Sequence, residues 1–130
     1  MKLNKILETA LYVKDLAKAE NFYCGILGLE KVSSTPNRDL FLRFGESMLL
    51  LFNPEQTEID GGIVPTHGSI GRGHMAFAVP KSELTGWASL LHKNGIAIEK
   101  NVEWDERDMS IYFRDPSGNS IELASETLYD

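Results

Sequence analysis

The sequence predicts an α+β fold built from two copies of a βαβββ module. Three observations point to it: an internal repeat, two amphipathic helical segments that each end at a glycine, and short strand-like segments after each glycine. Residues 8–32 recur in outline as residues 74–99, in a register that sets Val13 over Val79. We therefore expect a first module at residues 1–52, a connector at 53–73 and a second module at 74–130.

The first module is expected to begin with a strand at residues 6–13, where side chains alternate in character. This alternation places Glu8, Ala10 and Tyr12 on one face. Asp15 is the expected N-cap of the following helix, because its carboxylate can accept hydrogen bonds from free backbone N–H groups. Gly28 supplies the left-handed residue that ends this helix. The remaining strands are expected at residues 29–33, 40–44 and 47–52.

The second module repeats this plan. A strand at residues 74–79 leads through Pro80 into an amphipathic helix that ends at Gly95. Its later strands are expected at residues 96–102, 109–114 and 120–124. The segment Asp115-Pro116-Ser117-Gly118-Asn119 is typical of a hairpin turn, because proline restricts φ and glycine accepts a positive φ.

Composition and charge exclude several classes of protein. The 42% hydrophobic and 25% charged residues are ordinary for a soluble globular protein, and no apolar run is long enough to span a membrane. The net charge of −6, without clusters of basic and aromatic residues, argues against a nucleic-acid partner. The single cysteine, Cys24, cannot form an internal disulfide, so we expect a cytoplasmic protein.

Three side chains that can bind metal ions occupy matched places in the repeat. Glu8 falls over His74, and Glu122 interrupts a closing strand that is otherwise suited to burial. A buried carboxylate is costly unless it is paired or bound to a cation. Aligning residues 47–50 with residues 120–123 sets Leu49 opposite Glu122. Three of four matched positions can therefore bind a metal.

The chain resembles the vicinal oxygen chelate superfamily, which includes glyoxalase I, extradiol dioxygenases, and fosfomycin- and bleomycin-resistance proteins. The resemblance covers residues 6–124. The segments that carry it are Val13-Lys14-Asp15-Leu16, Phe22-Tyr23, Leu27-Gly28-Leu29, Gly73-His74-Met75-Ala76-Phe77, and Tyr112 to Asn119 followed by Glu122. It implies that the two modules curl into an incomplete mixed-sheet barrel around a divalent cation, with a helix packed outside each module.

The resemblance also implies a ligand set. His74 and Glu122 match common ligands of the family, Glu8 stands where many members have histidine, and Leu49 stands where glyoxalase I has a fourth ligand. Glu122 is in addition the expected catalytic residue. Two carboxylates and one imidazole favour Mn²⁺, Fe²⁺ or Mg²⁺, with Zn²⁺ and Ni²⁺ also compatible. The alternative for Glu8 is a position one register off, facing solvent.

The implied function is a metalloenzyme of the lyase or isomerase type. Its ion would chelate two neighbouring oxygens of a small molecule and act as a Lewis acid. Leu49 disfavours glyoxalase I chemistry, Ala10 disfavours fosfomycin thiol transfer, and Glu8 in place of histidine disfavours a dioxygenase. The alternative is a metal-free protein of the bleomycin-resistance type that sequesters a ligand. Family members are usually dimeric, so a homodimer is also implied.

Five residues are candidates for substrate binding. Ser110 and Tyr112 share the strand face of Glu122, at positions that hold substrate in the fosfomycin-resistance branch; the alternative for Tyr112 is a core residue. His67 and Arg72 are candidates for closing the pocket on an anion, or else belong to a surface loop. Trp104 is a candidate for the pocket rim and for contact with a cationic ligand, or else for a hairpin tip.

Overall fold

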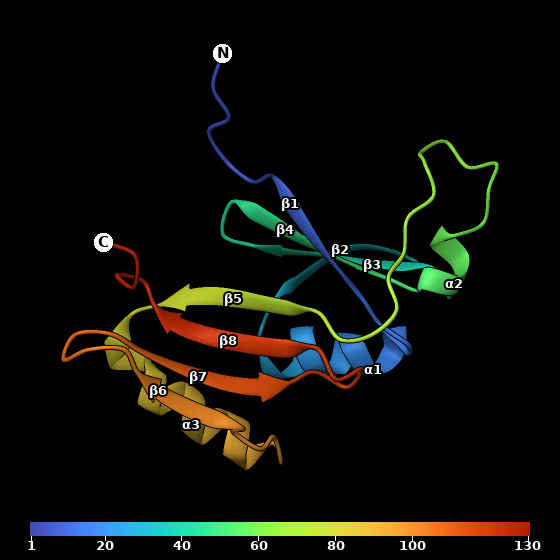
Figure 1. Cartoon of the computed structure of the whole chain (residues 1–130). Helices are drawn as coiled ribbons and strands as arrows, with labels where there is room; N and C mark the ends of the chain where they lie inside the picture. Colours follow the sequence, from blue (N-terminus) through green and yellow to red (C-terminus); the bar gives the residue numbers. More distant parts are fainter. The chain divides into compact units, whose positions relative to one another are not determined.

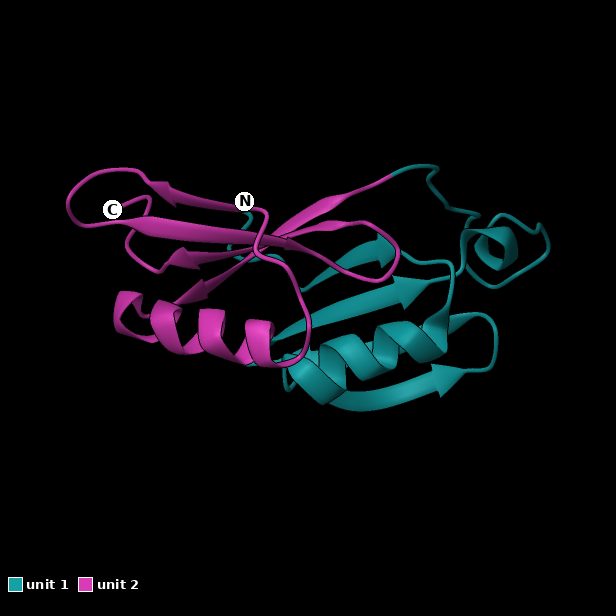
Figure 2. Ribbon diagram, turned by 90° about the horizontal axis from the view of Figure 1, so that it is seen from below, with its two compact units in different colours: residues 1–71 teal, residues 72–130 magenta.

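The computed structural model describes residues 1–130, and the chain divides into two compact units, Met1–Gly71 and Arg72–Asp130. Figure 2 distinguishes the two units by colour. Each contains one four-stranded mixed sheet with the βαβββ order, and neither sheet is closed. The predicted α+β fold of two βαβββ modules is therefore confirmed. No helix combines the length and the apolar character that crossing a membrane requires.

The first unit has the strand order β1-β4-β3-β2, in which β1 runs parallel to β4 and the other pairs are antiparallel. Figure 1 labels its strands and α-helices. The elements are β1 (Glu8–Tyr12), α1 (Leu16–Glu20), the π-helical segment η1 (Asn21–Ile26), β2 (Glu30–Thr35), β3 (Asp39–Phe44), β4 (Ser47–Phe52) and α2 (Pro54–Thr57).

The residues that begin and end the first helix follow the prediction, but the second half of the helix does not. The Asp15 side chain accepts a hydrogen bond of 3.0 Å from the backbone N–H of Lys18, and Gly28 has φ of +79°. The last six residues form a π-helical segment, in which Leu27 N–H bonds to the Phe22 carbonyl at 3.0 Å. A wider turn of this kind leaves the apolar spacing recognisable, so the sequence does not distinguish it from an α-helix.

The second unit repeats the topology with the order β5-β8-β7-β6, and β5 runs parallel to β8. Its elements are β5 (His74–Val79), the 3₁₀ turn η2 (Lys81–Glu83), α3 (Leu84–Lys93), β6 (Lys100–Glu103), β7 (Met109–Arg114) and β8 (Ser120–Ser125). The strand expected at residues 96–102 therefore begins later. Glu99, the residue before β6, already contacts β7, because its N–H group donates a hydrogen bond of 2.7 Å to the Tyr112 carbonyl oxygen.

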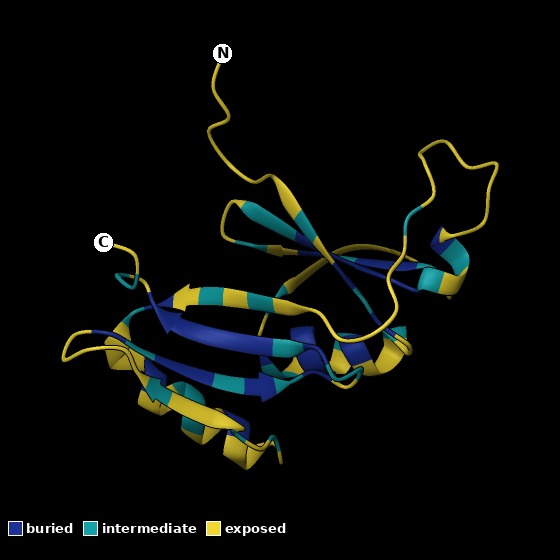
Figure 3. Ribbon diagram, in the orientation of Figure 1, coloured by how far each residue is buried: buried dark blue, intermediate teal, exposed yellow.

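Each sheet buries one face against its own helix. In the first unit, Leu42, Leu49 and Leu51 are fully buried together with Tyr23 of η1. In the second unit the equivalent apolar residues are Ile111, Phe113, Ile121, Leu123 and, from α3, Leu91. Figure 3 shows β8 almost entirely in dark blue, β4 and β7 in dark blue with teal sections, and the more exposed edge strand β5 in yellow and teal. The opposite face carries Glu8 in the first unit and His74, Ser110, Tyr112 and Glu122 in the second.

Strand pairing corrects one sequence alignment. In the second unit, Glu122 pairs with Ala76, two residues after His74. In the first unit, Ala10, two residues after Glu8, pairs with Leu50 and not with Leu49. Leu50 is therefore the counterpart of Glu122, and the placement of Leu49 opposite Glu122 was wrong by one residue. Leu49 points into the helix-facing core, because neighbouring residues of a strand point to opposite faces.

Candidate metal centre and pocket

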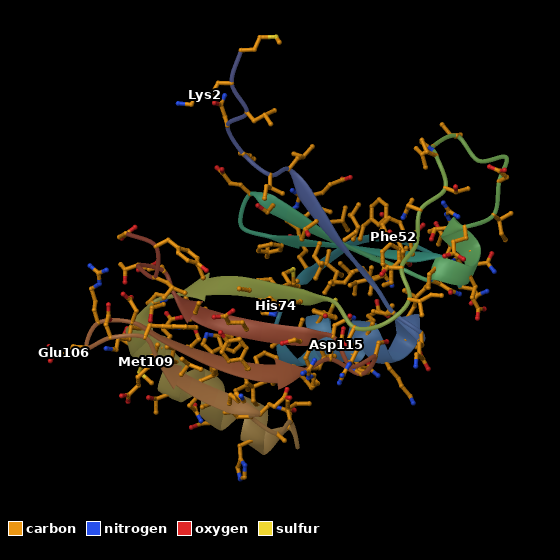
Figure 4. The ribbon with its side chains drawn as sticks, viewed as in Figure 1. Lys2, Phe52, His74, Glu106, Met109 and Asp115 are labelled. Atoms are coloured by element: carbon orange, nitrogen blue, oxygen red, sulfur yellow. The ribbon has the colours of Figure 1, made fainter.

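His74 and Glu122 meet on one face of the second sheet. His74 begins β5 and pairs with Ser120, and Glu122 lies two residues further along β8 on the same face. The Nε2 atom of His74 lies 3.3 Å from Oε2 of Glu122. The Glu122 side chain is only 8% exposed, whereas the His74 side chain is 52% exposed. Figure 4 labels His74 on β5. A nearly buried carboxylate thus contacts a half-exposed imidazole.

The hydrogen bonds of His74 determine what fits between these two atoms. Its Nδ1 lies 3.1 Å from the carbonyl oxygen of Ser120, which can only accept, so Nδ1 carries the proton and donates. In the neutral ring, Nε2 then presents a lone pair to the carboxylate oxygen of Glu122. Two lone pairs at this distance require a proton or a cation between them. Ligands about 2.1 Å from one metal ion lie roughly 3.0–3.4 Å apart in octahedral or tetrahedral geometry, so the pair fits a divalent ion.

Tyr112 holds the other oxygen of the same carboxylate. Its hydroxyl donates to Oε1 of Glu122 over 2.9 Å, and its ring stacks against that of His74 with centroids 6.2 Å apart. Burial raises the pKa of Tyr112, and the hydrogen bond to Glu122 and the charge of that carboxylate raise it further. The Tyr112 hydroxyl therefore stays protonated at neutral pH. Because Tyr112 occupies Oε1 of Glu122, the other oxygen, Oε2, is the one that faces His74.

Ser110 continues this polar face along β7, and Trp104, which directly follows β6, is hydrogen-bonded to it. The Nε1–H group of Trp104 donates to Oγ of Ser110 over 2.9 Å. Ser110 is fully buried, and the Trp104 residue is 51% exposed. The indole therefore lies at the solvent-facing edge of the same face. The structure thus gathers four of the predicted site residues in the second unit: His74, Glu122, Tyr112 and Ser110, with Trp104 bonded to the last of these.

Arg72 lies elsewhere in the second unit. Its side chain approaches Gly118 in the turn before β8, where an added Cβ atom would lie 3.1 Å from the Arg72 Cδ atom. Its charge also helps to lower the pKa of Glu99, which is lowered mainly by a hydrogen bond from Arg114. No third His, Cys, Asp or Glu side chain joins His74 and Glu122 in the second unit.

The first unit has a pocket of about 680 Å³ on the corresponding face of its sheet. Glu8 lines it, as do the apolar side chains of Leu50, Phe41 and Phe52. The Phe41 and Phe52 rings pack edge to face, with centroids 5.8 Å apart and planes at 82°. The remaining lining residues are Thr9, Ala10, Arg38, Asp39, Val64, Pro65, Thr66 and His67. Its size and largely apolar lining suit a small organic molecule.

His67 lies in this pocket and is hydrogen-bonded to Tyr12, which is not among the predicted site residues. Its Nδ1 lies 2.7 Å from the hydroxyl oxygen of Tyr12, 55 residues away in the chain. Its ring also packs edge to face on Phe52, with centroids 4.7 Å apart. The alternation of side chains in β1 could have indicated that Tyr12 belongs to the site, because Tyr12 lies on the same face as Glu8 and Ala10. The pairing with His67 had no sequence signal.

Comparisons with known proteins place these features in a family context. A family model described as Glyoxalase/Bleomycin resistance protein/Dioxygenase superfamily matches residues 5–123. A metallothiol transferase FosB from Staphylococcus saprophyticus is 33% identical over 119 residues, which are 91% of this chain and 74% of that protein. A catechol-2,3-dioxygenase from Bacillus subtilis is 25% identical over 89% of this chain, but only 39% of that enzyme is covered.

A solved structure shows the same fold. The crystal structure of a lactoylglutathione lyase from Agrobacterium tumefaciens superimposes with a TM-score of 0.95 and 36% sequence identity, covering 99% of this chain and 98% of the other. The likeness therefore extends over essentially the whole of both chains.

Proposed function

Because the chain belongs to the glyoxalase/bleomycin resistance protein/dioxygenase superfamily, we propose that it is a divalent-metal-dependent enzyme acting on a small molecule with two neighbouring oxygen atoms. The observation that carries the proposal is the pair of His74 Nε2 and Glu122 Oε2, 3.3 Å apart, with the other ring nitrogen and the other carboxylate oxygen already hydrogen-bonded. This is the arrangement expected of two oriented metal ligands.

We propose Glu8 as the third ligand. Glu8 begins β1 as His74 begins β5. Glu8 lies two residues before Ala10, which pairs with Leu50, just as His74 lies two residues before Ala76, which pairs with Glu122. Leu50, the counterpart of Glu122, has no ligating atom, so the protein would supply three ligands and leave the remaining positions for substrate oxygens. Two carboxylates and one imidazole form a hard set, which favours Mn²⁺, Fe²⁺ or Mg²⁺ over Zn²⁺ and Ni²⁺.

The residues around the ion would divide the chemistry. A bound divalent ion acts as a Lewis acid that polarises the substrate oxygens. Glu122 would both help to hold the ion and serve as the proton carrier, taking a proton from one substrate carbon and returning it to the neighbouring atom, which is lyase- or isomerase-type chemistry. The Tyr112 hydroxyl holds Glu122 in place. The buried Ser110 hydroxyl and the Trp104 indole border the face on which the substrate would lie.

Metal content tests the proposal directly. We expect the protein dialysed against Mn²⁺ to retain about one ion per chain by elemental analysis, and His74→Ala and Glu122→Ala each to lose it. Matched controls are His92→Ala and Glu126→Ala, which remove the same side chains from exposed positions of the same unit. The proposal is wrong if the site variants retain as much metal as the controls, or if no divalent ion binds the wild type.

Reaction type needs a separate assay. The similarity to a lactoylglutathione lyase supports the lyase type, and the similarity to FosB supports thiol transfer as the competing chemistry. Because Leu50 stands where glyoxalase I has its fourth ligand, we expect the metal-loaded protein to convert lactoylglutathione only weakly, and the Glu122→Gln variant to lose this conversion altogether. If the protein binds metal but does not convert lactoylglutathione, the proposed metal centre stands and lactoylglutathione is rejected as its substrate.

A metal-free ligand-sequestering protein is the second candidate. The observation that favours it is the aromatic pocket of the first unit, which is formed without His74 or Glu122. Failure to bind any divalent ion, together with tight binding of a bulky aromatic cation, would establish this candidate instead. We also propose a homodimer in the cytoplasm, where Cys24 stays reduced; light scattering at the expected mass of one 14.5 kDa chain would contradict the dimer.

A further inference from the structure

The backbone of His67 is anchored to α2. Its N–H group donates to the carbonyl oxygen of Thr57 over 3.1 Å, and Thr57 is buried. The helix itself begins at a strong signal, because the side chain of Asn53 accepts a hydrogen bond of 3.1 Å from Glu55 N–H and Pro54 occupies the first turn. His67 therefore has a defined place at the pocket, although the neighbouring connector is rich in glycine.

The ring of His67 is oriented by two aromatic neighbours. Tyr12 bonds to its Nδ1 at 2.7 Å, and Phe52 packs against it edge to face. Burial raises the pKa of Tyr12, and the nearby charge of Glu58 raises it further, so the hydroxyl keeps its proton. If Tyr12 donates to Nδ1, the single proton of the neutral imidazole is on Nε2. The pocket-lining histidine then presents an N–H donor.

The pocket walls select the shape of a ligand. Phe41 and Phe52 pack edge to face, and Leu50 lies beside them, so the walls favour a flat or ring-shaped apolar group. The Arg38 guanidinium lies 3.7 Å from the Asp39 carboxylate, and it also donates to a backbone carbonyl. The lining cation thus has partners of its own, and His67 is the lining donor whose ring is oriented by contacts with Tyr12 and Phe52.

The two polar positions lie well apart along β1. Tyr12 is the hydrogen-bond partner of His67. Glu8 and Tyr12 are four residues apart in the strand, which corresponds to about 13 Å. We propose that His67, oriented by Tyr12, recognises the substrate by donating an Nε2–H hydrogen bond to a carbonyl or carboxylate oxygen on a ring-bearing compound. The oxygens that undergo chemistry would lie toward Glu8, so this role rests on the function proposed above.

The tautomer of His67 is the first test. In protein labelled with ¹⁵N at histidine, we expect neutral His67 to show an unprotonated Nδ1 and a protonated Nε2, and Tyr12→Phe to produce a mixture of tautomers. The exposed His92 on α3 serves as an internal control, and the His67→Gln variant identifies the signals. A protonated Nδ1 in the wild type, or a tautomer that Tyr12→Phe leaves unchanged, would overturn the proposal.

Ligand binding is the second test, carried out on metal-free protein so that its result does not depend on the metal centre. Acetophenone has a ring and a carbonyl, benzoate has a ring and a carboxylate, ethylbenzene lacks the acceptor and acetate lacks the ring. We expect His67→Ala to weaken acetophenone or benzoate binding about three- to tenfold, the loss of one net hydrogen bond, and to leave ethylbenzene unchanged. We expect Phe41→Ala to weaken all three ring compounds.

Restoration by a conservative variant distinguishes recognition from a merely structural effect. His67→Gln retains an N–H donor, so we expect it to recover part of the acetophenone or benzoate affinity that His67→Ala loses. Equal losses for acetophenone and ethylbenzene in His67→Ala would contradict the proposal, as would the failure of every ring compound to bind. A protein that passes these tests but binds no metal would retain this recognition site and lose only the proposed enzyme function.

Discussion

The Tyr112–Glu122 pair has an apolar counterpart in the first unit, and the comparison predicts the outcome of a double substitution. Tyr112 pairs with Glu122 across β7 and β8, and Phe41 pairs with Leu50 across β3 and β4. The same place in the repeat thus holds a hydrogen-bonded pair in one unit and a hydrocarbon pair in the other. Each unit accommodates its own pair in a four-stranded sheet of identical strand order.

Single substitutions should destabilise the second unit. Tyr112→Phe removes the donor to a carboxylate that is 8% exposed, and a hydrogen bond to a charged group contributes about 1.5–3 kcal/mol. Because the carboxylate keeps its contact with His74 in this variant, we expect a loss at the lower end of that range, about 1.5–2 kcal/mol. Glu122→Leu leaves the half-buried Tyr112 hydroxyl without its acceptor, at a cost of about 1 kcal/mol.

The double variant Tyr112→Phe/Glu122→Leu should recover most of this loss. It reproduces the Phe41–Leu50 pair and leaves no polar atom of the two residues unpaired, so we expect a coupling free energy of about 1–2 kcal/mol. Urea denaturation of metal-free protein, followed by tryptophan fluorescence, measures it. Trp87 and Trp104 both belong to the second unit, so the signal reports that unit.

Tyr129→Phe is the matched control, because it removes a hydroxyl from a residue that is 97% exposed, and we expect it to change the free energy of unfolding by less than about 0.5 kcal/mol. The reasoning is refuted if the loss of unfolding free energy in the double variant equals the sum of the losses in the two single variants, within about 0.3–0.5 kcal/mol. Additivity would mean that Tyr112 does not donate to Glu122.

Three further predictions test the fold around the site. Gly118→Ala should destabilise the second unit by about 1–2 kcal/mol in urea denaturation, because Gly118 has φ of +87°. Leu49→Glu should unfold the first unit by placing a charge in its core, whereas Leu50→Glu, which faces the pocket, should leave it folded by circular dichroism. Thr127→Val should raise the pKa of Asp108, measured by carboxyl ¹³C NMR, because the Thr127 hydroxyl is the main cause that lowers it, followed by Arg107. Since that pKa is lowered in the folded state, the carboxylate stabilises the protein above the ordinary aspartate pKa, and this contribution is lost as pH falls through the folded value.

Each of these has a control or a contradicting result. Gly86 lies in α3 with nothing within 4 Å of an added Cβ atom, so Gly86→Ala should be neutral or stabilising. Equal losses in the two glycine variants would show that positive φ is not the cause. Equal tolerance of glutamate at positions 49 and 50 would reject the strand register. An Asp108 pKa that does not change in Thr127→Val would reject the hydrogen bond from Thr127.

Much of the fold was accessible from the sequence because its signals are local. Asp15 caps α1, and both Gly28 and Gly95 have positive φ where their helices end. The turn before β8 likewise has its positive φ at Gly118. The position of Leu50 was missed, because aligning residues by serine spacing ignores the hydrogen-bond register, and a slip of one residue reverses the face of every side chain.

The site was predictable only where the repeat marks it. His74 and Glu122 interrupt apolar strands at matched places, and the structure brings them together as one pair. The bond between Tyr12 and His67 joins residues 55 positions apart and depends on how the connector folds back. That connector begins with the short helix α2, whose Asn53-Pro54 start is a readable capping signal, although the glycines that follow it obscured the helix.

Anomalous X-ray diffraction from crystals grown with Mn²⁺ is the most direct measurement of the proposed metal centre. The account predicts one anomalous peak within about 2.0–2.3 Å of both His74 Nε2 and Glu122 Oε2, with the Tyr112 hydroxyl still on Oε1. The contradicting result is a peak elsewhere on the chain, or no peak while the imidazole and the carboxylate remain in mutual contact.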